Sequence, residues 1–296
     1  MTHQTKGILS VMVPVVTWGI SFVSIEVLLD VLGPMTIGAI RFTMATALLY
    51  LMMKQKKVSM TIQPKDRGLF FMAGSIGIAL YFFFENTGIR YISAAPSSLI
   101  LAAIPAATLV AEMVFYKRKA GWMDFIIFSG SIIGVFMIVS GDSGGSGSDR
   151  LIGYLMMVGA VLTWVVYSIA SKPLFGRYDY LTIIFYQFFY SLPFFWLSVP
   201  FEVNHFSAIT AEHVVHMVFL AVFASVLGFY YYARAMDLIG VTETSLFINL
   251  IPIVTIVFSL LYLHKGISLH QWIGGTVVLL AVTLDGKRQK QVKDTA

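Results

Sequence analysis

The chain lacks cysteine and carries few charged residues. Because it has no cysteine, disulfides, thiolate metal sites and cysteine nucleophiles are all excluded. Only 12% of its 296 residues are charged, about half the share found in soluble domains. Hydrophobic residues make up 58%, and the mean hydropathy is +0.82. This composition indicates a protein embedded in a lipid bilayer.

Long apolar runs recur along the whole sequence. Each can cross the roughly 30 Å hydrocarbon core of a bilayer as a helix, and none alternates polar and apolar residues as the strands of a membrane barrel do. We therefore predict an all-α integral membrane protein with ten transmembrane helices, at residues 8–29, 34–53, 68–89, 93–115, 121–140, 152–174, 180–199, 213–235, 241–263 and 270–286.

The second half of the chain repeats the first at an offset of about 147 residues. Residues 94–105 align with 241–252, where a serine and a proline recur at matching positions, and Trp18 meets Trp164 at nearly the same offset. Five spans in each half is an odd number, so the two halves must cross the bilayer in opposite directions. We predict a 5+5 inverted-topology repeat, which is typical of alternating-access transporters.

A glycine- and serine-rich stretch joins the two halves. Residues 141–149 contain only Gly, Ser and Asp, a composition typical of a flexible tether. We divide the chain into a first five-helix repeat (1–140), a flexible linker (141–150) and a second five-helix repeat (151–296). The other loops are short, so any chemistry must occur among the spans.

Lysine and arginine are distributed unequally between the two sides of the membrane. If the N-terminus is cytoplasmic, sixteen lie at cytoplasmic loops and span ends, and three lie outside, namely Arg90, Arg150 and Lys265. Because cytoplasmic loops are enriched in these residues, we predict a multi-pass protein of the inner membrane with both termini in the cytoplasm. The net charge of +5 follows from these span ends and predicts no nucleic-acid partner.

Four motifs carry a family resemblance. Trp18-Gly19-x-Ser21-Phe22, Arg41-Phe42, the segment 85–94 and the segment 249–255 resemble EamA-type members of the drug/metabolite transporter superfamily. The resemblance covers the whole chain. It implies a ten-helix inverted-repeat carrier whose central cavity is lined by spans 1, 3, 4, 6, 8 and 9, and which often exports amino acids or other small metabolites.

The chain departs from the family pattern at three charged positions. Glu26 stands where a lysine is common, and Arg118 and Lys265 stand where an acidic residue is common. An ion pair that the family builds at these positions is therefore not expected in the same form here.

Ionisable residues inside spans are costly, about 2.5–3.5 kcal/mol each at a helix centre. Glu26, Arg41 and Glu85 all fall on the extracellular side of the midplane and could form one network. Arg41 could simply neutralise a carboxylate and brace the spans. With two acids and one base, however, one carboxylate remains for a substrate amine or a coupling proton. Glu85 is the better candidate, because it shares a helical face with Tyr81 and with small glycines.

Glu112 lies near the cytoplasmic end of span 4, close to the depth of Lys172 on span 6. Two interpretations remain open. One is a salt bridge whose side chains reach the interface, and the other is an inner gate.

Spans 4 and 9 each contain a proline, Pro105 and Pro252, at matching positions of the repeat. A proline interrupts the hydrogen-bond ladder, and in a membrane the freed carbonyls are tolerated where protein or cavity water satisfies them. Corresponding interrupted helices in two halves point to a binding site at the midplane.

Trp18 and Trp164 lie some ten residues inside their spans, unlike the tryptophans at span ends. They could pack in the core or form a wall for an apolar or cationic substrate. The predicted substrate-binding residues are Trp18, Tyr81, Glu85, Asn86, Ser98, Trp164, Tyr167, Tyr231, Tyr232, Ser245 and Asn249. The predicted charge or coupling network is Glu26, Arg41, Glu85, Glu112 and Lys172.

We expect no cofactor, no catalytic residue and no metal site, since the histidines form no ligand cluster. The predicted function is secondary transport, most simply export, of a small metabolite such as an amino acid or amine. The chain would act as a monomer or homodimer, and a proton is the candidate coupling ion. A carrier of a neutral or anionic metabolite is the alternative. An intramembrane enzyme and a non-transporting receptor or scaffold are further alternatives, and both predict no counterflow.

Overall fold

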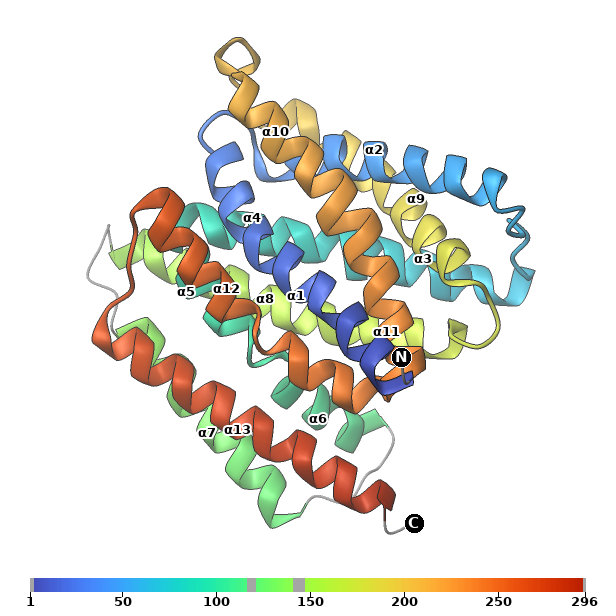
Figure 1. The fold of residues 1–296 in the computed structure, drawn as a ribbon. Helices are drawn as coiled ribbons and strands as arrows, with labels where there is room; N and C mark the ends of the chain where they lie inside the picture. Colours follow the sequence, from blue (N-terminus) through green and yellow to red (C-terminus); the bar gives the residue numbers. More distant parts are fainter. Residues whose placement is uncertain (1–2, 116–120, 141–146, 295–296) are drawn as a thin grey trace.

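The computed structural model describes residues 3–115, 121–140 and 147–294, and within them the chain forms helices and loops without a β-sheet. The helices pack side by side in one bundle, and the start of α1 and the end of α13 lie toward the same end of it (Figure 1). The α-helices are α1 (His3–Leu28), α2 (Pro34–Gln55), α3 (Arg67–Gly74), α4 (Tyr81–Ile92), α5 (Ala94–Leu101), α6 (Ile104–Phe115), α7 (Trp122–Ser140), α8 (Gly147–Ser171), α9 (Tyr180–Ser198), α10 (Ala211–Phe219), α11 (Gly228–Ile248), α12 (Ile251–Phe258) and α13 (Leu269–Asp294).

Seven helices in the described part of the chain are long and apolar enough to cross a membrane. Three further apolar helices are shorter, at Ala94–Thr108, Ile251–Leu263 and Leu269–Ala281. The all-helical membrane architecture predicted from composition is confirmed. The shorter helices fall where the fourth, ninth and tenth spans are expected.

Two helices are interrupted at matching positions of the repeat. The α-helical hydrogen-bond ladder is interrupted by turns at residues 102–103, just before Pro105, and again at 249–250, just before Pro252. Because proline has no N–H, the carbonyl four residues before each proline loses its usual helical partner. The sequence prediction of corresponding breaks is confirmed.

The described part of the bundle contains three π-helical segments: η2 (Ser75–Leu80), η6 (Leu220–Leu227) and η7 (Ser259–Leu263). The first joins α3 to α4 and the second joins α10 to α11. At an offset of 147 residues, η2 falls within η6. Wider π-turns are frequent at functional sites in proteins, so these two segments direct attention to the region between them.

Helices of the two halves are interleaved. α1 packs mainly against α11 and α12, whereas α8 packs mainly against α4 and also contacts α3 and η2. α2 lies along α9, and α7 lies along α13 (Figure 1). The first helix of each half therefore packs chiefly against the opposite half, and the junction between the halves is built largely around α1 and α8.

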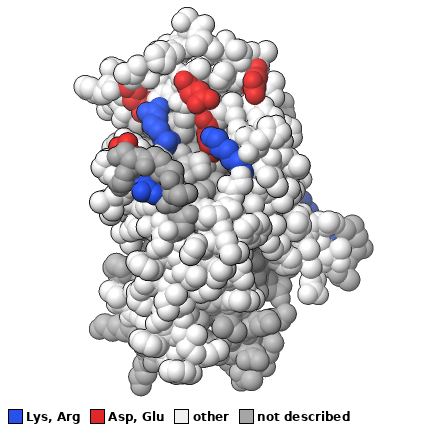
Figure 2. Space-filling view, turned by 90° about the vertical axis from the view of Figure 1, so that its left-hand side faces the viewer, with Lys and Arg blue, Asp and Glu red and all other residues white. Residues whose placement is uncertain are grey.

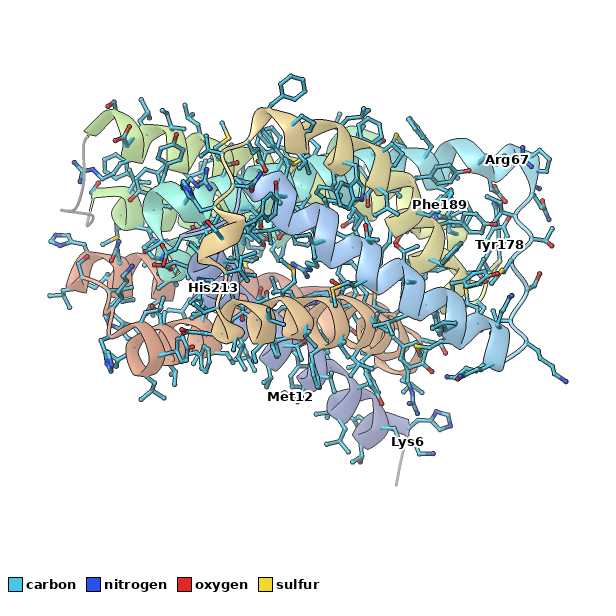
Figure 3. All side chains as sticks on the ribbon, turned by 90° about the horizontal axis from the view of Figure 1, so that it is seen from above. Lys6, Met12, Arg67, Tyr178, Phe189 and His213 are labelled. Carbon is cyan, nitrogen blue, oxygen red and sulfur yellow. The ribbon has the colours of Figure 1, made fainter. Side chains whose placement is uncertain are left out.

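The contact between α2 and α9 is fixed at both ends by hydrogen bonds. At one end, Glu202 accepts from the backbone N–H groups of Met35 and Thr36, each at 2.8 Å. At the other, Asp66 pairs with Arg177 at 3.0 Å and accepts from Tyr178 at 2.7 Å. Partial burial, together with the bond to Asp66, raises the pKa of Tyr178. Figure 3 shows Tyr178 and Arg67 at one end of the bundle and His213 toward the other.

The structure differs from the sequence prediction in two places. α8 begins at Gly147, so the last residues of the expected linker are helical, and Asp149 in the first turn complements the helix dipole. α11 continues to Ile248 through the loop expected after residue 235. In the first half the corresponding connection is broken by Ser93, whose φ of 67° interrupts the helix.

Candidate functional site

Aromatic rings from both halves meet at the junction of α1 and α8. Trp18 and Trp164 lie edge to face with ring centroids 6.0 Å apart. Trp18 also contacts Tyr232 at 5.2 Å, and Trp164 contacts Tyr81 at 5.0 Å and Tyr167 at 4.9 Å. These five residues are called the aromatic cluster below. Four helices, α1, α4, α8 and α11, contribute to it.

Glu85 lies beside the aromatic cluster. Its side chain is 4% exposed and accepts a hydrogen bond of 2.6 Å from the hydroxyl of Tyr81, one turn earlier on α4. The carboxylate is thus linked through Tyr81 to Trp164. A buried carboxylate next to aromatic faces can bind an alkylammonium group, because the carboxylate supplies charge and the rings supply cation–π contact.

Arg41 reaches from α2 toward the second half of the chain. It is 2% exposed, donates from Nε to Ser225 of η6 at 2.7 Å, and stacks over Phe82 at 4.5 Å. Its charge lies close enough to interact with Glu85, but no ion pair joins the two side chains within the described residues. Arg41 Nη1 has no partner in that part of the chain.

The π-helix η6 binds two side chains of the first half, Trp18 and Arg41. Trp18 donates its indole N–H to the carbonyl of Ala224 at 2.8 Å, next to the Ser225 that binds Arg41. A Cβ on Gly228 would lie 2.6 Å from Trp18 Nε1, so this glycine leaves the space that the indole fills. In η2, Gly77 leaves similar space for Tyr167. The two π-helices therefore flank the aromatic cluster.

The helix breaks contribute polar groups that are buried. Asn249 lies within the second break, is 6% exposed, and its Nδ2 has no partner among the described groups. Ser98, one turn before the first break, is buried and donates to the carbonyl of Ala95 at 2.8 Å. The breaks belong to helices that contact each other, since α5 packs against α12.

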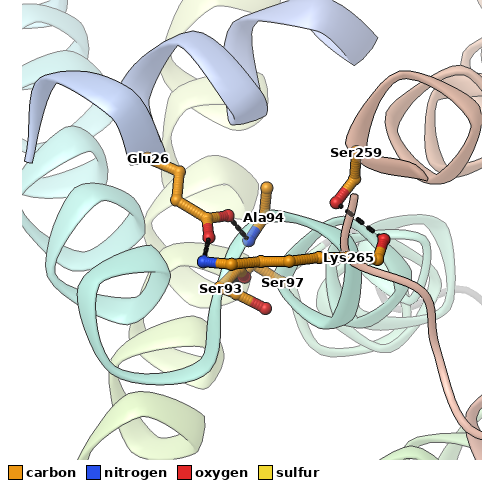
Figure 4. A network of polar contacts seen from close by, with 6 residues as sticks. All are labelled: Glu26, Ser93, Ala94, Ser97, Ser259 and Lys265. Carbon is orange, nitrogen blue, oxygen red and sulfur yellow. Dashed lines mark hydrogen bonds and ion pairs between the residues drawn. The ribbon is translucent and has the colours of Figure 1, made fainter. Parts of the chain in front are cut away.

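Glu26 does not join Arg41 and Glu85 in one network, contrary to the sequence expectation. Its Oε1 lies 2.7 Å from Nζ of Lys265, and its Oε2 accepts from the backbone N–H of Ala94 at 2.6 Å (Figure 4). The carboxylate thus connects α1 to the start of α5 and to the connection between η7 and α13. The three residues lie at similar depths along their helices, but the side chain of Glu26 faces Lys265 and Ala94.

The Glu26–Lys265 pair carries the opposite polarity to the charges that the family resemblance implies at these two positions. An ion pair therefore joins two of the three positions at which this chain departs from the family pattern. Figure 2 shows the end of the bundle that contains the connection from α4 to α5 and the connection from η7 to α13. Acidic and basic side chains gather together on part of this face, and most of the remaining surface is neutral.

The remaining predicted residues are distributed more widely. Asn86 faces the start of α2, where it donates to the carbonyl of Pro34 at 2.9 Å. Tyr231 stacks with Arg234 and has no ring contact with the aromatic cluster among the contacts described. Lys172 is exposed in a short 3₁₀ turn. The side chains of Glu112 and Ser245 lie outside the described residues, so the gate that involves Glu112 stays a prediction.

Sequence reasoning missed three residues that complete this region, and a fourth, His216, that is not part of the substrate site. Ser225 binds Arg41, and Phe229 contacts Trp18 at 5.2 Å. Gln187 is fully buried and accepts from Tyr167 at 3.3 Å. His216 binds Ser24 of α1. A buried polar residue within an apolar run, such as Gln187, was the one local signal available.

Similar proteins are named as transporters. A probable terminal-alkyne amino-acid exporter of Streptantibioticus cattleyicolor is 24% identical over 284 residues, which cover 96% of this chain and 94% of that protein. An uncharacterized transporter of Archaeoglobus fulgidus is 23% identical, over 90% of this chain and 93% of its own length.

A solved crystal structure shares the fold. It matches with a TM-score of 0.64 at 17% identity, over 96% of this chain and 99% of its own. The profile of the EamA-like transporter family matches residues 5–140 and 151–284. The chain therefore belongs to the EamA-like transporter family, and it is a multi-pass membrane transporter rather than an enzyme.

Proposed function

We propose that this protein is a secondary carrier that exports an amino acid or a related amine across the inner membrane. The observation that carries the proposal is the buried Glu85, bonded to Tyr81 at the edge of the aromatic cluster. A substrate ammonium group would lie between this carboxylate and the rings of Trp18 and Trp164. The similar protein named as a probable amino-acid exporter supports the substrate class.

The mechanism that we propose is alternating access by two inverted five-helix halves. Three observations support it: the family profile matches two segments of nearly equal length, the helix breaks fall at matching positions, and the first helix of each half packs against the opposite half. The three shorter apolar helices would complete ten spans. Both termini would lie in the cytoplasm, in agreement with the distribution of lysine and arginine.

In this mechanism the substrate binds where the halves meet and is released when one half tilts against the other. The α2–α9 contact, hydrogen-bonded at both ends, would remain closed in both states. The contact that Glu26 and Lys265 make between α1 and the second half lies at one end, so it would open and close.

A carrier of anionic metabolites is the second candidate, and Arg41 is the ground for it. Its guanidinium is buried between aromatic rings, and Nη1 lacks a partner among the described residues. A substrate carboxylate could accept from it. An amino acid would satisfy both Glu85 and Arg41, whereas a simple amine or a simple carboxylate would satisfy one of them.

Thermal stabilisation of the purified protein tests the substrate class, because a ligand that binds the folded state raises its melting temperature. A panel would pair each amino acid with its decarboxylated amine and its deaminated acid. We expect selective stabilisation by amino acids, with weaker effects of the amines. Stabilisation by the acids alone would favour the anionic carrier and would contradict the role of Glu85.

A further inference from the structure

His216 is a buried histidine with a partner at each ring nitrogen. It is 7% exposed, and it lies near the start of the span formed by α10, η6 and α11. Nδ1 lies 3.0 Å from the hydroxyl of Ser24 on α1, and Nε2 lies 3.0 Å from the hydroxyl of Tyr262 in η7. Nothing in the substrate site proposed above makes use of this residue.

The contacts of His216 continue to the surface. Tyr262 donates to Glu212 at 2.6 Å. Glu212 is exposed, Tyr262 is 40% exposed, His216 is 7% exposed and Ser24 is completely buried, so the series runs from the surface into the interior. These four side chains, called the proton path below, connect the aqueous phase to the interior face of α1.

We propose that His216 is the binding site of a coupling proton, which Glu212 and Tyr262 deliver from the end of the bundle that is extracellular in the proposed orientation. The proposal rests on the transport function argued above and extends it to the coupling ion. Imidazole suits this task because it changes its charge between about pH 5 and pH 8.

The hydrogen-bond geometry permits a balanced transfer. When Glu212 takes up a proton from water, its O–H can donate to the Tyr262 oxygen while the Tyr262 O–H donates to Nε2 of His216. If each of these two protons moves along its hydrogen bond to the acceptor atom, Glu212 is ionised again and Tyr262 is unchanged. The imidazole becomes an imidazolium, which donates from Nε2 to Tyr262 and from Nδ1 to Ser24. One proton enters, and every other group is restored.

Protonation of His216 affects the junction between the halves. A neutral ring that accepts the proton at Nε2 already carries a hydrogen on Nδ1, which donates to Ser24, so protonation keeps this bond and adds a positive charge beside α1. Ser24 lies two residues before Glu26, and Tyr262 lies three residues before Lys265. The proton path and the Glu26–Lys265 pair thus end on the same two segments, and a new positive charge there would alter the contact that opens and closes.

Other charged groups are near enough to influence this site. α10 itself carries His213, whose Nδ1 accepts from the backbone N–H of Thr210. η6, which packs against α10, carries no ionisable side chain. On α10 and on the other segments that contact it or His216, the ionisable groups nearest in position along the helices are Glu26 on α1, Arg41 on α2, Glu212 and His213 on α10, Tyr262 in η7 and Lys265 after it. His3 and Lys6 on α1 and Tyr50 and Lys54 on α2 lie toward the opposite ends of those two helices.

Transport in proteoliposomes with an imposed pH gradient tests the proposal, using an amino acid selected by the stabilisation panel. His216→Gln keeps a hydrogen-bonding side chain that cannot be protonated, and Tyr262→Phe interrupts the path but keeps the imidazole. The matched control is His270→Gln, at an exposed histidine on α13. We expect His216→Gln to retain exchange without a gradient but to lose gradient-driven accumulation, Tyr262→Phe to slow it about tenfold, and the control to match the wild type.

Gradient-driven accumulation by folded His216→Gln at the wild-type level would overturn the proposal. So would a wild type that exchanges substrate without responding to a pH gradient. A wild type without any exchange would instead refute the proposed function.

A measurement independent of transport distinguishes failure of the proton-site proposal from failure of the proposed function. The chain has six histidines, so the NMR signal of ¹⁵N-labelled His216 can be assigned by its loss in His216→Gln. We expect this signal to titrate between about pH 5 and pH 8. A His216 ring that keeps a single neutral form over this range would contradict the proposal whether or not transport is observed.

Discussion

Trp18 donates its indole N–H to the carbonyl of Ala224 at 2.8 Å, which fixes a first-half ring against a π-helical turn of the second half. Ala224 lies in this π-helix, and a carbonyl oxygen has two lone pairs, so it can accept from the indole in addition to a helix donor. Because Trp18 also contacts Trp164 and Tyr232, this one bond sets the orientation of the aromatic cluster across the junction.

Gly228→Ala tests this orientation. The added Cβ would lie 2.6 Å from Trp18 Nε1, so the indole must move and lose its bond to Ala224. We expect substrate affinity to fall about 5- to 30-fold, since a lost hydrogen bond at a buried site corresponds to about 1–2 kcal/mol. Substrate titrations monitored by tryptophan fluorescence would measure the change.

Gly68→Ala is the matched control, because a Cβ at this position meets nothing within 4 Å. It should bind substrate as the wild type does. Unchanged affinity in folded Gly228→Ala would show that the position of Trp18 does not determine binding.

Charge exchange tests the contact between Glu26 and Lys265. Lys265→Glu places two carboxylates together at the end of α1, and we expect lower thermal stability and slower exchange. Adding Glu26→Lys restores an ion pair of the opposite polarity, although the bond to the N–H of Ala94 is lost. The double variant should therefore recover most but not all of both properties. A double variant no better than Lys265→Glu would argue against a direct interaction.

Reporter fusions test the inverted topology. Reporters fused after residue 145 should read outside, whereas those fused after residues 60 and 118 and at the C-terminus should read inside. The reason is the strong excess of lysine and arginine at the loops placed in the cytoplasm. A cytoplasmic reporter after residue 145 would be inconsistent with two halves of five spans each.

The repeat made several features predictable. Trp18 and Trp164 could be matched because they occupy equivalent positions, and the two prolines predicted the location of both helix breaks. These features depend on covalent position along the chain, which a duplication preserves. The two tryptophans contact each other because α1 and α8 each pack against helices of the opposite half.

Rotation about the helix axis was the main feature that could not be predicted. Counting residues placed Glu26 at a depth similar to that of Glu85, but depth does not specify which neighbour a side chain faces. His216 was missed for a related reason: its partners Ser24 and Tyr262 are 192 and 46 residues away in sequence, and no local pattern connects them.

Counterflow of amino acids into proteoliposomes, compared between the wild type and Glu85→Gln, tests the central claim most directly. Glutamine keeps the shape and the hydrogen bond to Tyr81 but removes the charge, and Asp30→Asn makes the same change at an exposed carboxylate as a control. We expect amino-acid exchange by the wild type and the control, and a loss of about 10- to 100-fold in Glu85→Gln, as for a lost charge-assisted hydrogen bond. Wild-type exchange rates and affinity in folded Glu85→Gln, or no amino-acid exchange by the wild type, would contradict the proposed function.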